Sequence, residues 1–474
     1  MKMKIIIASI LAFGMLASCE LIGDIDSIKP EHQLEEENVA SSATKVELML
    51  NGIYEGWRQI DVSKFRAHGS ALSGSLIITG NITGSQEFVS NSILPDNFAL
   101  TNWYTNLYAI VNSANMLIVQ LENGKAPDLK PKRRTEILAE CKMQRSMAWF
   151  YLLRTYSSFY NSNSRLGIVI TKEPFREATQ IPRSTVKEAY SAILEDLSFA
   201  VTNLPQATKH YRLSIAAALS FKAKLMLYMK DYQQAESVAK QAIEAAEADG
   251  YKLENTYGDI FIKGYNSEEV LFAPYTFGIS ESMPFDYRRV AYGTETFKLA
   301  DLLLDGTANG NHSTGEGLDA RFSITFRNSS GTKAPLGKYP HNDNVMDVCG
   351  NTFFHLRLAE VYLIHAEAAA RNSHYTEARQ SLQVVLSRAG YSENQSTSFT
   401  DNELLDAIRK HKWIELVSEN YEEWFDMIRY YSEGDLSMSD LGKIKSTIAN
   451  EKQLILPIPQ NALAGNSKLE QNPL

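Results

Sequence analysis

Apolar residues recur every three or four positions between residues 186 and 204, with polar residues between them. That spacing places one apolar stripe along a helix, so it predicts an amphipathic helix packed on a core. Thr185 and Glu188 have the spacing of a capping box, in which each side chain accepts a backbone N–H at the helix start. Pro205 marks the end of the helix, because proline cannot continue it.

The chain also contains a degenerate internal repeat. Residues 216–243 resemble residues 359–386, and the alignment superposes Ala223 on Ala366 and Ala235 on Ala378. A small residue on each of two consecutive helices permits close approach, which is the tetratricopeptide (TPR) pattern. The alternative is an unrelated helical hairpin with polar faces. Two further helix pairs are predicted, at 101–121 with 133–157 and at 186–204 with 212–229. The fold is therefore predicted to be mainly α.

Two segments lack this helical periodicity. Residues 62–100 and 274–352 are rich in Gly, Ser, Asn and Asp, and residues 269–273 form a short β-like stretch. Irregular segments of this length are unusual as simple connections in a compact domain and often carry function. A helical scaffold with such loops is typical of a binding protein.

The first residues have the features of an export signal. Lys2 and Lys4 precede an apolar run over residues 5–16, which is shorter than the roughly 20 residues of a membrane-spanning helix. Residues 16–19 read Leu-Ala-Ser-Cys, which predicts a bacterial lipobox with cleavage before Cys19 and acylation of that cysteine. The alternative is an ordinary signal peptide with a chance cysteine. We predict a lipoprotein signal peptide over 1–18, an acidic lipid-anchored tether over 19–40 and one folded domain over 41–474.

The net charge argues against one class of partner, and the number of cysteines argues against a fold held by disulfides. The formal net charge is −9, which argues against a nucleic-acid partner because phosphate binding needs clustered Lys and Arg. After cleavage only Cys141 and Cys349 accompany Cys19, and two distant cysteines do not make a disulfide framework. We predict that both are buried free thiols.

Several short motifs occur in an order that is typical of one protein family. They are Asn-Gly-Ile-Tyr at 51–54, a Trp-Tyr to Asn helix over 103–115, Ala-Glu to Tyr over 139–151, Ile-Pro-Arg-Ser-Thr at 181–185, Asp-x-Arg at 319–321, Arg-Leu-Ala-Glu-Val-Tyr-Leu at 357–363, Leu-Pro-Ile-Pro at 456–459 and Gln-Asn-Pro at 471–473. With these motifs the chain resembles the SusD/RagB family from near Cys19 to its last residue. The region 411–424 departs from the common family pattern and resembles a variant with Lys-Trp-Ile and Glu-x-Trp, which leaves the subgroup open.

The resemblance implies both a fold and a function. The fold is a right-handed superhelix of TPR-like helix pairs with long irregular loops and a few short β-hairpins. The function is that of an outer-membrane lipoprotein, facing the cell exterior, that binds oligosaccharides and delivers them to a SusC-type TonB-dependent transporter as its lid. A RagB-like peptide-binding lipoprotein is the first alternative, and a TPR-type scaffold of the cell envelope is the second.

Catalytic signals are weak. The pair Glu422 and Glu423 has the composition of a glycosidase dyad, but adjacent helical residues point about 100° apart, which favours a solvated face or a salt bridge. His365 and His374 lack a metal-ligand spacing, and we interpret them as structural. We therefore expect a binding protein without catalytic residues, metal or cofactor.

Aromatic side chains are the expected sugar platforms, because the apolar face of a pyranose packs on a flat ring. All five tryptophans fall in helical stretches and are predicted to be core residues: Trp57, Trp103, Trp149, Trp413 and Trp424. The candidate ligand-binding residues are therefore those of the second irregular segment: Tyr275, Phe277, Phe285, Tyr287 and Arg288, with Arg289 and Tyr292 beside them. Phe88, near Gln86 and Asn91, is a second candidate. The alternative for each ring is local packing within its loop.

Overall fold

A computed structural model describes most of the chain from residue 39 onward. The described residues are 39–62, 65–78, 84–175, 179–207, 209–276, 290–291, 320–325, 328–329, 332–333, 338 and 352–473. Helices dominate these residues, which confirms the prediction of a mainly α fold. The predicted signal peptide and nearly all of the tether, Cys19 included, lie outside the described residues.

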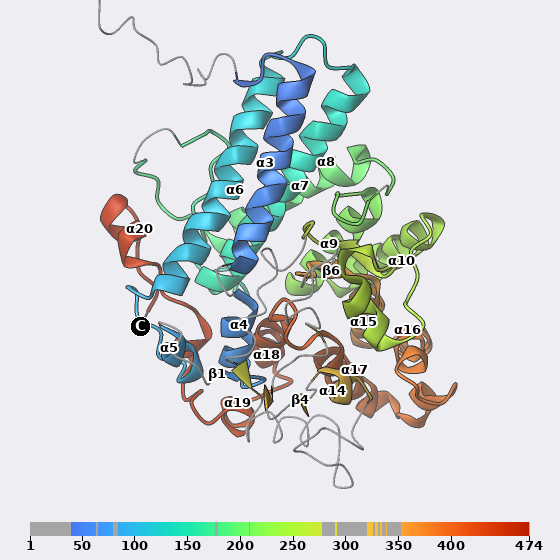
Figure 1. Cartoon of the computed structure of the whole chain (residues 1–474). Coiled ribbons are helices and arrows are strands. Elements are labelled where there is room, and N and C mark those ends of the chain that lie inside the picture. Colours follow the sequence, from blue (N-terminus) through green and yellow to red (C-terminus); the bar gives the residue numbers. More distant parts are fainter. Residues whose placement is uncertain are drawn as a thin grey trace, which may run out of the picture.

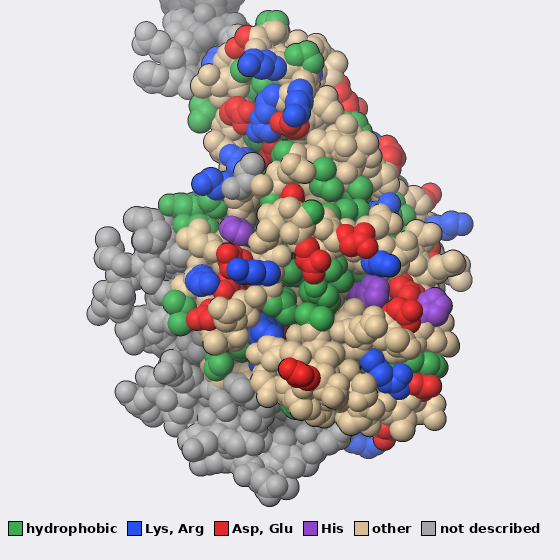
Figure 2. Space-filling view, turned by 90° about the vertical axis from the view of Figure 1, so that its right-hand side faces the viewer, with side chains coloured by type: hydrophobic (Ala, Val, Ile, Leu, Met, Phe, Trp, Pro, Cys, Tyr) green, Lys and Arg blue, Asp and Glu red, His purple; other side chains and the backbone are tan. Residues whose placement is uncertain are grey.

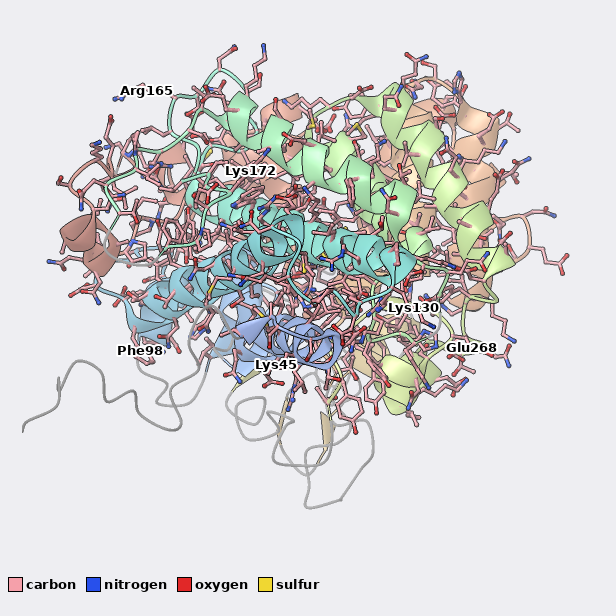
Figure 3. The ribbon with its side chains drawn as sticks, turned by 90° about the horizontal axis from the view of Figure 1, so that it is seen from above. Lys45, Phe98, Lys130, Arg165, Lys172 and Glu268 are labelled. Carbon is pink, nitrogen blue, oxygen red and sulfur yellow. The ribbon has the colours of Figure 1, made fainter. Side chains whose placement is uncertain are left out.

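Four long helices form the N-terminal layer. They are α3 (Ala43–Val62), α6 (Phe98–Glu122), α7 (Pro131–Tyr156) and α8 (Val186–Asn203), each packed on the next (Figure 1). Seen from above, α6 and α7 extend between Phe98 at one end and Lys130 at the other (Figure 3). The helix predicted over 186–204 is confirmed as α8, and Thr185 and Glu188 form the predicted capping box.

The internal repeat corresponds to two helical hairpins. The first is α9 (Ile215–Tyr228) with α10 (Tyr232–Ala248), and the second is α15 (Leu358–Arg371) with α16 (Tyr375–Arg388). Although they are distant in sequence, the hairpins are neighbours, because α10 packs on α15 (Figure 1). The four alanines of the repeat are fully buried, as close helix approach requires: Ala223, Ala235, Ala366 and Ala378. The right-handed superhelical course of the pairs stays a prediction.

The C-terminal helices complete the core beneath these layers. They are α17 (Asp401–Leu416), α18 (Glu422–Glu433) and α19 (Met438–Ile444), and α18 packs on α4 (Phe65–Ser73). The shorter helices are α5 (Ser85–Val89), α11 (Tyr257–Lys263), η2 (Gly264–Asn266), α14 (Ala320–Thr325), η4 (Gln395–Ser398), η5 (Glu451–Leu454) and α20 (Gln460–Gly465). No helix in the described part of the chain combines the length and apolar character needed to span a membrane.

The strands are short and form three antiparallel pairs. They are β1 (Ile77–Ile78) with β3 (Val290–Ala291), β2 (Val270–Phe272) with β6 (Leu356–Arg357), and β4 (Asn328–Ser329) with β5 (Thr332–Lys333). The β-like stretch predicted over 269–273 is confirmed as β2. Its pairing, Val270 with Arg357 and Phe272 with Leu356, brings together the two ends of the second irregular segment.

The prediction of an irregular segment over 62–100 is wrong in part, because this region includes α4, α5 and the start of α6. Its Gly and Ser residues reflect close packing. A Cβ atom on Gly69 would lie 2.0 Å from the Tyr421 ring, so only glycine fits there. Ser70 and Ser73 are buried, and Ser73 donates a hydrogen bond to the Ser70 carbonyl at 3.0 Å. Composition therefore suggested loops where small residues in fact allow helices to pack.

The predicted core residues are buried as expected. All five tryptophans are buried, which confirms that they are core residues. Cys141 is a buried free thiol, as predicted, whereas Cys349 lies outside the described residues. On the surface shown in Figure 2, acidic and basic side chains are interspersed.

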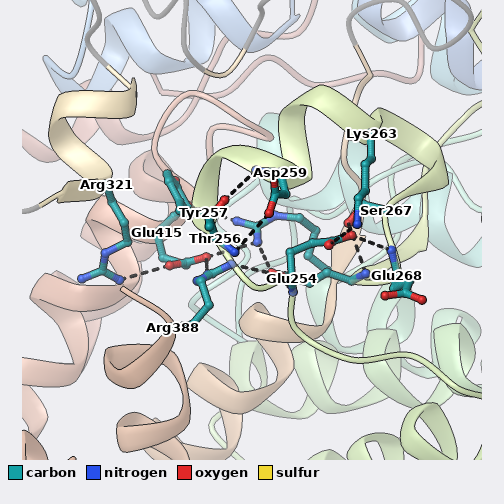
Figure 4. A network of polar contacts seen from close by, with 12 residues as sticks. Glu254, Thr256, Tyr257, Asp259, Lys263, Ser267, Glu268, Arg321, Arg388 and Glu415 are labelled. Atoms are coloured by element: carbon teal, nitrogen blue, oxygen red, sulfur yellow. Dashed lines mark hydrogen bonds and ion pairs between the residues drawn. The ribbon is translucent and has the colours of Figure 1, made fainter. Parts of the chain in front are cut away.

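A buried ionic network lies where the second irregular segment joins the core. Glu415 of α17 forms ion pairs with Arg321 at 3.1 Å, with Arg357 at 3.2 Å and with Arg388 (Figure 4). Glu269, which precedes β2, pairs with Arg357 at 2.5 Å and with Arg388 at 2.9 Å. These five side chains are at most 3% exposed. The network connects α14, α16, α17 and the β2–β6 pair.

Candidate ligand-binding site

Three tyrosines converge at the end of β2, and we call them the tyrosine cluster: Tyr211, Tyr265 and Tyr275. The rings of Tyr211 and Tyr275 meet edge to face with centroids 5.4 Å apart, and those of Tyr265 and Tyr275 are 5.1 Å apart. Tyr265 is buried, Tyr211 is half-buried and Tyr275 is 40% exposed. The cluster therefore has a buried base and an exposed aromatic ring.

The backbone around the cluster is held by regular contacts. Tyr211 lies just before Ser214, whose side chain caps α9. The His210 carbonyl accepts the Ala273 amide at 3.1 Å, and the His210 ring bonds the Val270 carbonyl at 2.7 Å. These bonds fix the loop before α9 against β2. Tyr211 and Tyr275 are consequently placed side by side by two separate elements of the scaffold.

A polar group lies next to Tyr211 in sequence. The Arg212 guanidinium lies over the Tyr54 ring, 4.5 Å from its centroid, and donates to the Asn51 side chain. Its other nitrogen lies 3.6 Å from a Glu140 carboxylate oxygen, and the Tyr54 hydroxyl donates to the same carboxylate at 2.6 Å. The Arg212 side chain is 28% exposed, but its Nη1 is buried and its Nη2 donates to Asn51, so the guanidinium ties the loop before α9 to α3.

The second irregular segment begins and ends at the cluster. The chain passes Tyr275 as it leaves the described core at Thr276 and returns at Thr352. There the Thr352 hydroxyl accepts the Tyr265 amide at 2.9 Å. The pairing of β2 with β6 and the buried ion pairs between side chains in Figure 4 hold the two ends of the segment together. A ligand bound at the cluster would therefore lie at the base of this segment.

The sequence candidates differ in where the structure places them. Tyr275 lies in the cluster, whereas Phe277, Phe285, Tyr287, Arg288, Arg289 and Tyr292 lie outside the described residues. Phe88 requires a correction: it is fully buried, and its ring packs on His68 and Trp103 with centroids 4.5 and 5.2 Å apart. A ring enclosed on these sides offers no face to a ligand. Phe88 was chosen because it is an aromatic residue in a segment of mainly polar composition. That segment forms the unexpected helix α5, which buries the Phe88 ring in the core.

Sequence reasoning missed a second aromatic surface. A groove of about 340 Å³ lies between α6, α20 and the chain around Val169 and Phe175, and its walls include Tyr104 and Tyr108. Tyr104 and Tyr108 contact each other with centroids 4.7 Å apart, and burial raises the pKa of Tyr104 to about 12. Their spacing of four residues places them on one helix face, a signal that was available in the sequence.

Asparagines of the family-like motif shape this groove. Asn115 donates to the carbonyls of Thr171 and Glu173, both at 3.0 Å, and Asn112 accepts the Phe175 amide at 2.6 Å. These bonds bring the 171–175 loop onto α6, so Phe175 comes near Tyr108. The two asparagines of this motif therefore hold the loop that forms one wall of the groove.

The weaker chemical candidates have structural roles. Glu422 is buried and pairs with Arg154 at 2.8 Å and with Lys224 at 3.1 Å, which corresponds to the salt-bridge interpretation. For Glu423 the prediction of a solvated face or a salt bridge is wrong, because this residue is buried and its carboxylate accepts hydrogen bonds from Ser70 and Ser418. His365 contacts the Ser381 hydroxyl at 2.9 Å, and exposed His374 contacts Glu236 at 2.8 Å. Among the described residues, no group of three His, Cys, Asp or Glu side chains is arranged to hold a metal.

Comparisons with known proteins agree on one family. A family model described as the SusD family matches residues 327–474, and another, described as starch-binding and associating with the outer membrane, matches residues 26–227. A SusD-like protein of Formosa agariphila is 22% identical over 98% of this chain and 97% of its own. A SusD-like protein of Bacteroides ovatus is 25% identical over 73% of this chain and 68% of its own.

Solved structures share the fold. A SusD superfamily protein of Bacteroides thetaiotaomicron superposes with a TM-score of 0.74 at 22% identity, over 91% of this chain and all of that one. A structure that contains a xylogluco-oligosaccharide has a TM-score of 0.69 at 19% identity, over 89% of this chain and 97% of that one. At these identities the likeness establishes the fold.

Proposed function

The chain belongs to the SusD/RagB family, and on that premise we propose that it is a cell-surface lipoprotein that binds oligosaccharides. One observation carries the proposal: an exposed tyrosine on a buried aromatic base, placed where the long second segment joins the scaffold. The match to a starch-binding family that associates with the outer membrane supports a glycan ligand, as does the relative solved with a xylogluco-oligosaccharide.

The geometry of the tyrosine cluster suits a sugar ring. The flat face of Tyr275 provides an apolar surface for the C–H groups of a pyranose, while the phenol groups of the cluster offer hydrogen bonds to its hydroxyls. Tyr211 and Tyr265 support the ring from behind, so little side-chain freedom is lost on binding. We propose that Phe277, Phe285, Tyr287 and Arg288 complete the site from the segment that starts here.

We further propose that the protein acts as the lid of a SusC-type TonB-dependent transporter. The predicted acyl anchor at Cys19, followed by an acidic tether over 19–40, would hold the folded domain at the membrane surface. Transport energy then comes from the partner, so this chain needs to bind and release its ligand without chemical change.

The test is calorimetric titration of the mature protein with a panel of oligosaccharides and peptides. We expect at least one glycan to bind without turnover. Tyr275→Ala should weaken its binding by about fivefold to tenfold, which corresponds to roughly 1–1.4 kcal/mol of stacking energy. Tyr275→Phe is the matched control, because it keeps the ring and removes only the hydroxyl, and it should retain most of the affinity.

Three results would contradict the proposal. Unchanged affinity in Tyr275→Ala, with a loss in Tyr104→Ala, would move the glycan site to the groove along α6. Binding of peptides with no binding of any glycan would favour a RagB-like peptide carrier. Release of smaller products from a bound glycan would show that the protein is an enzyme.

A further inference from the structure

A separate cavity lies between α17, α18 and α19 and encloses about 250 Å³. Its mouth is formed by polar residues such as exposed Lys443, and its floor by buried residues such as Trp413, Met427 and Ile444. It shares no residue with the tyrosine cluster. The gradient from a polar mouth to a largely apolar floor is that of a small-molecule site.

One residue in the wall of this cavity carries a buried carboxyl group without a counter-ion. Glu423 lines the cavity and is 4% exposed. One of its oxygens accepts the Ser70 hydroxyl at 2.7 Å and the Ser418 amide at 3.2 Å, and the other has no hydrogen-bond partner. Every other buried carboxylate among the described residues forms an ion pair with Lys or Arg. Without such a partner, burial raises the pKa of Glu423 to about 7.

The basic residues that line the cavity are already engaged with other carboxylates. Arg409 and Lys410 pair with Asp406, Lys412 pairs with Asp426, and Lys443 pairs with Asp440. None of them forms an ion pair with Glu423 within the described part of the chain. Arg409 leaves its Nη1 without a hydrogen bond, but that nitrogen lies 3.9 Å from an Asp435 oxygen. Among the described charged residues that line this cavity, the one without a counter-ion is therefore an acid, so the complementary ligand carries a positive charge.

We propose that this cavity binds a small organic cation, an ammonium group carried on an apolar ring or chain, with Glu423 as its counter-ion. Trp413 and Tyr430 supply aromatic walls, which attract cations through their ring faces. Met427 and Ile444 surround the apolar body. An apolar cavity of about 150 Å³ is known to hold benzene, so this one has room for a ring and an ammonium group. The site goes beyond the proposed glycan site and is independent of it.

The experiment uses the whole mature protein and 2-phenylethylamine as the probe, titrated by calorimetry at about pH 8. At that pH the Glu423 carboxyl is mostly ionised and a primary amine is still protonated. We expect binding of the amine, at least tenfold weaker binding of 2-phenylethanol, and at least tenfold weaker amine binding in Glu423→Gln. Glu244→Gln, which removes an exposed acid from α10, is the matched control and should bind like the parent.

A second variant keeps the test decisive if Glu423→Gln folds poorly. Met427→Trp fills the cavity without changing its charge and should abolish amine binding, with folding verified by circular dichroism. Equal affinity for the amine and the alcohol would overturn the assignment of a cation. Undiminished amine binding in folded Glu423→Gln or Met427→Trp would overturn the site.

No binding of the amine to the parent protein would show that Glu423 is only a buried acid. Because Tyr275→Ala leaves this cavity intact, failure here is distinguishable from failure of the glycan site.

Discussion

Replacing Glu415 with Gln removes one negative charge from a buried place where three arginines meet. Burial acts to raise the pKa of Glu415, but Arg388, Arg357 and Arg321 outweigh it and hold that pKa well below its usual value. In the variant, Arg357 keeps Glu269 and Glu419 as partners and Arg388 keeps Glu269, whereas Arg321 loses its ion pair and keeps its contacts with His411. Breaking a buried ion pair in this way typically costs about 3–5 kcal/mol.

That cost translates into a measurable shift in the melting temperature. A folded chain of roughly 430 residues has an unfolding entropy of about 0.9 kcal/mol per kelvin, if it unfolds as one unit. A loss of about 4 kcal/mol then lowers the midpoint by roughly 4 °C. The assay is thermal unfolding of the mature protein followed by circular dichroism. Glu244→Gln makes the same chemical change at an exposed position and should shift the free energy of unfolding by less than about 0.5 kcal/mol.

The pH dependence gives an independent test. Because the pKa of Glu415 is lower in the folded state than its ordinary value of 4.5, its contribution is complete above that value and is lost as pH falls below it. The difference in stability between parent and variant should therefore be constant near neutral pH and shrink in acid. A variant as stable as the parent at about pH 7, or a difference that grows in acid, would refute the claim that Glu415 stabilises the fold.

Other predictions test the scaffold and the anchor. Ala366→Leu should overpack the α15–α16 contact and lower the free energy of unfolding by about 1–3 kcal/mol in denaturant titrations, whereas an unchanged midpoint would contradict the TPR-like packing. Thr185→Ala should remove the cap of α8 and cost about 1 kcal/mol in the same assay, and Thr202→Ala, at an exposed site of α8, should cost less. Cys19→Ala should release the protein from the membrane fraction of cells; retention in that fraction would refute the acyl anchor.

The helical scaffold was predictable because the spacing of apolar residues along the sequence shows which face of each helix is buried. In α8 the apolar stripe, the capping box and the final proline all agree, so both ends were placed within one residue. Region 62–100 was mispredicted because Gly69 and Ser70 look like loop residues in composition. Their small size is instead required by Tyr421 and Glu423 of a helix that lies about 350 residues further along the chain. A local pattern carries no information about such a distant neighbour.

The candidate site was predictable only in part. Tyr275 was a candidate because it is an aromatic residue of the second irregular segment, but the Tyr211 and Tyr265 rings that it contacts come from other elements. The bond from the Ala273 amide to the His210 carbonyl holds Tyr211 near Tyr275, and the bond from the Tyr265 amide to Thr352 fixes the third tyrosine. Phe88 shows the converse error, since a ring in a polar segment was packed into the core. Juxtaposition of distant residues is a property of the tertiary fold.

The motifs that identify the family act mainly on the fold. Arg145 pairs with Asp196 at 2.7 Å, and Arg183 donates to the Asn472 side chain at 2.8 Å, which joins the 181–185 motif to the C-terminal one. Arg357 joins β6 to Glu419 at 2.7 Å. Residues bound this tightly within the protein are unavailable to a ligand. Such motifs therefore identify the scaffold, and we propose that ligand preference depends instead on Tyr275 and the residues that follow it.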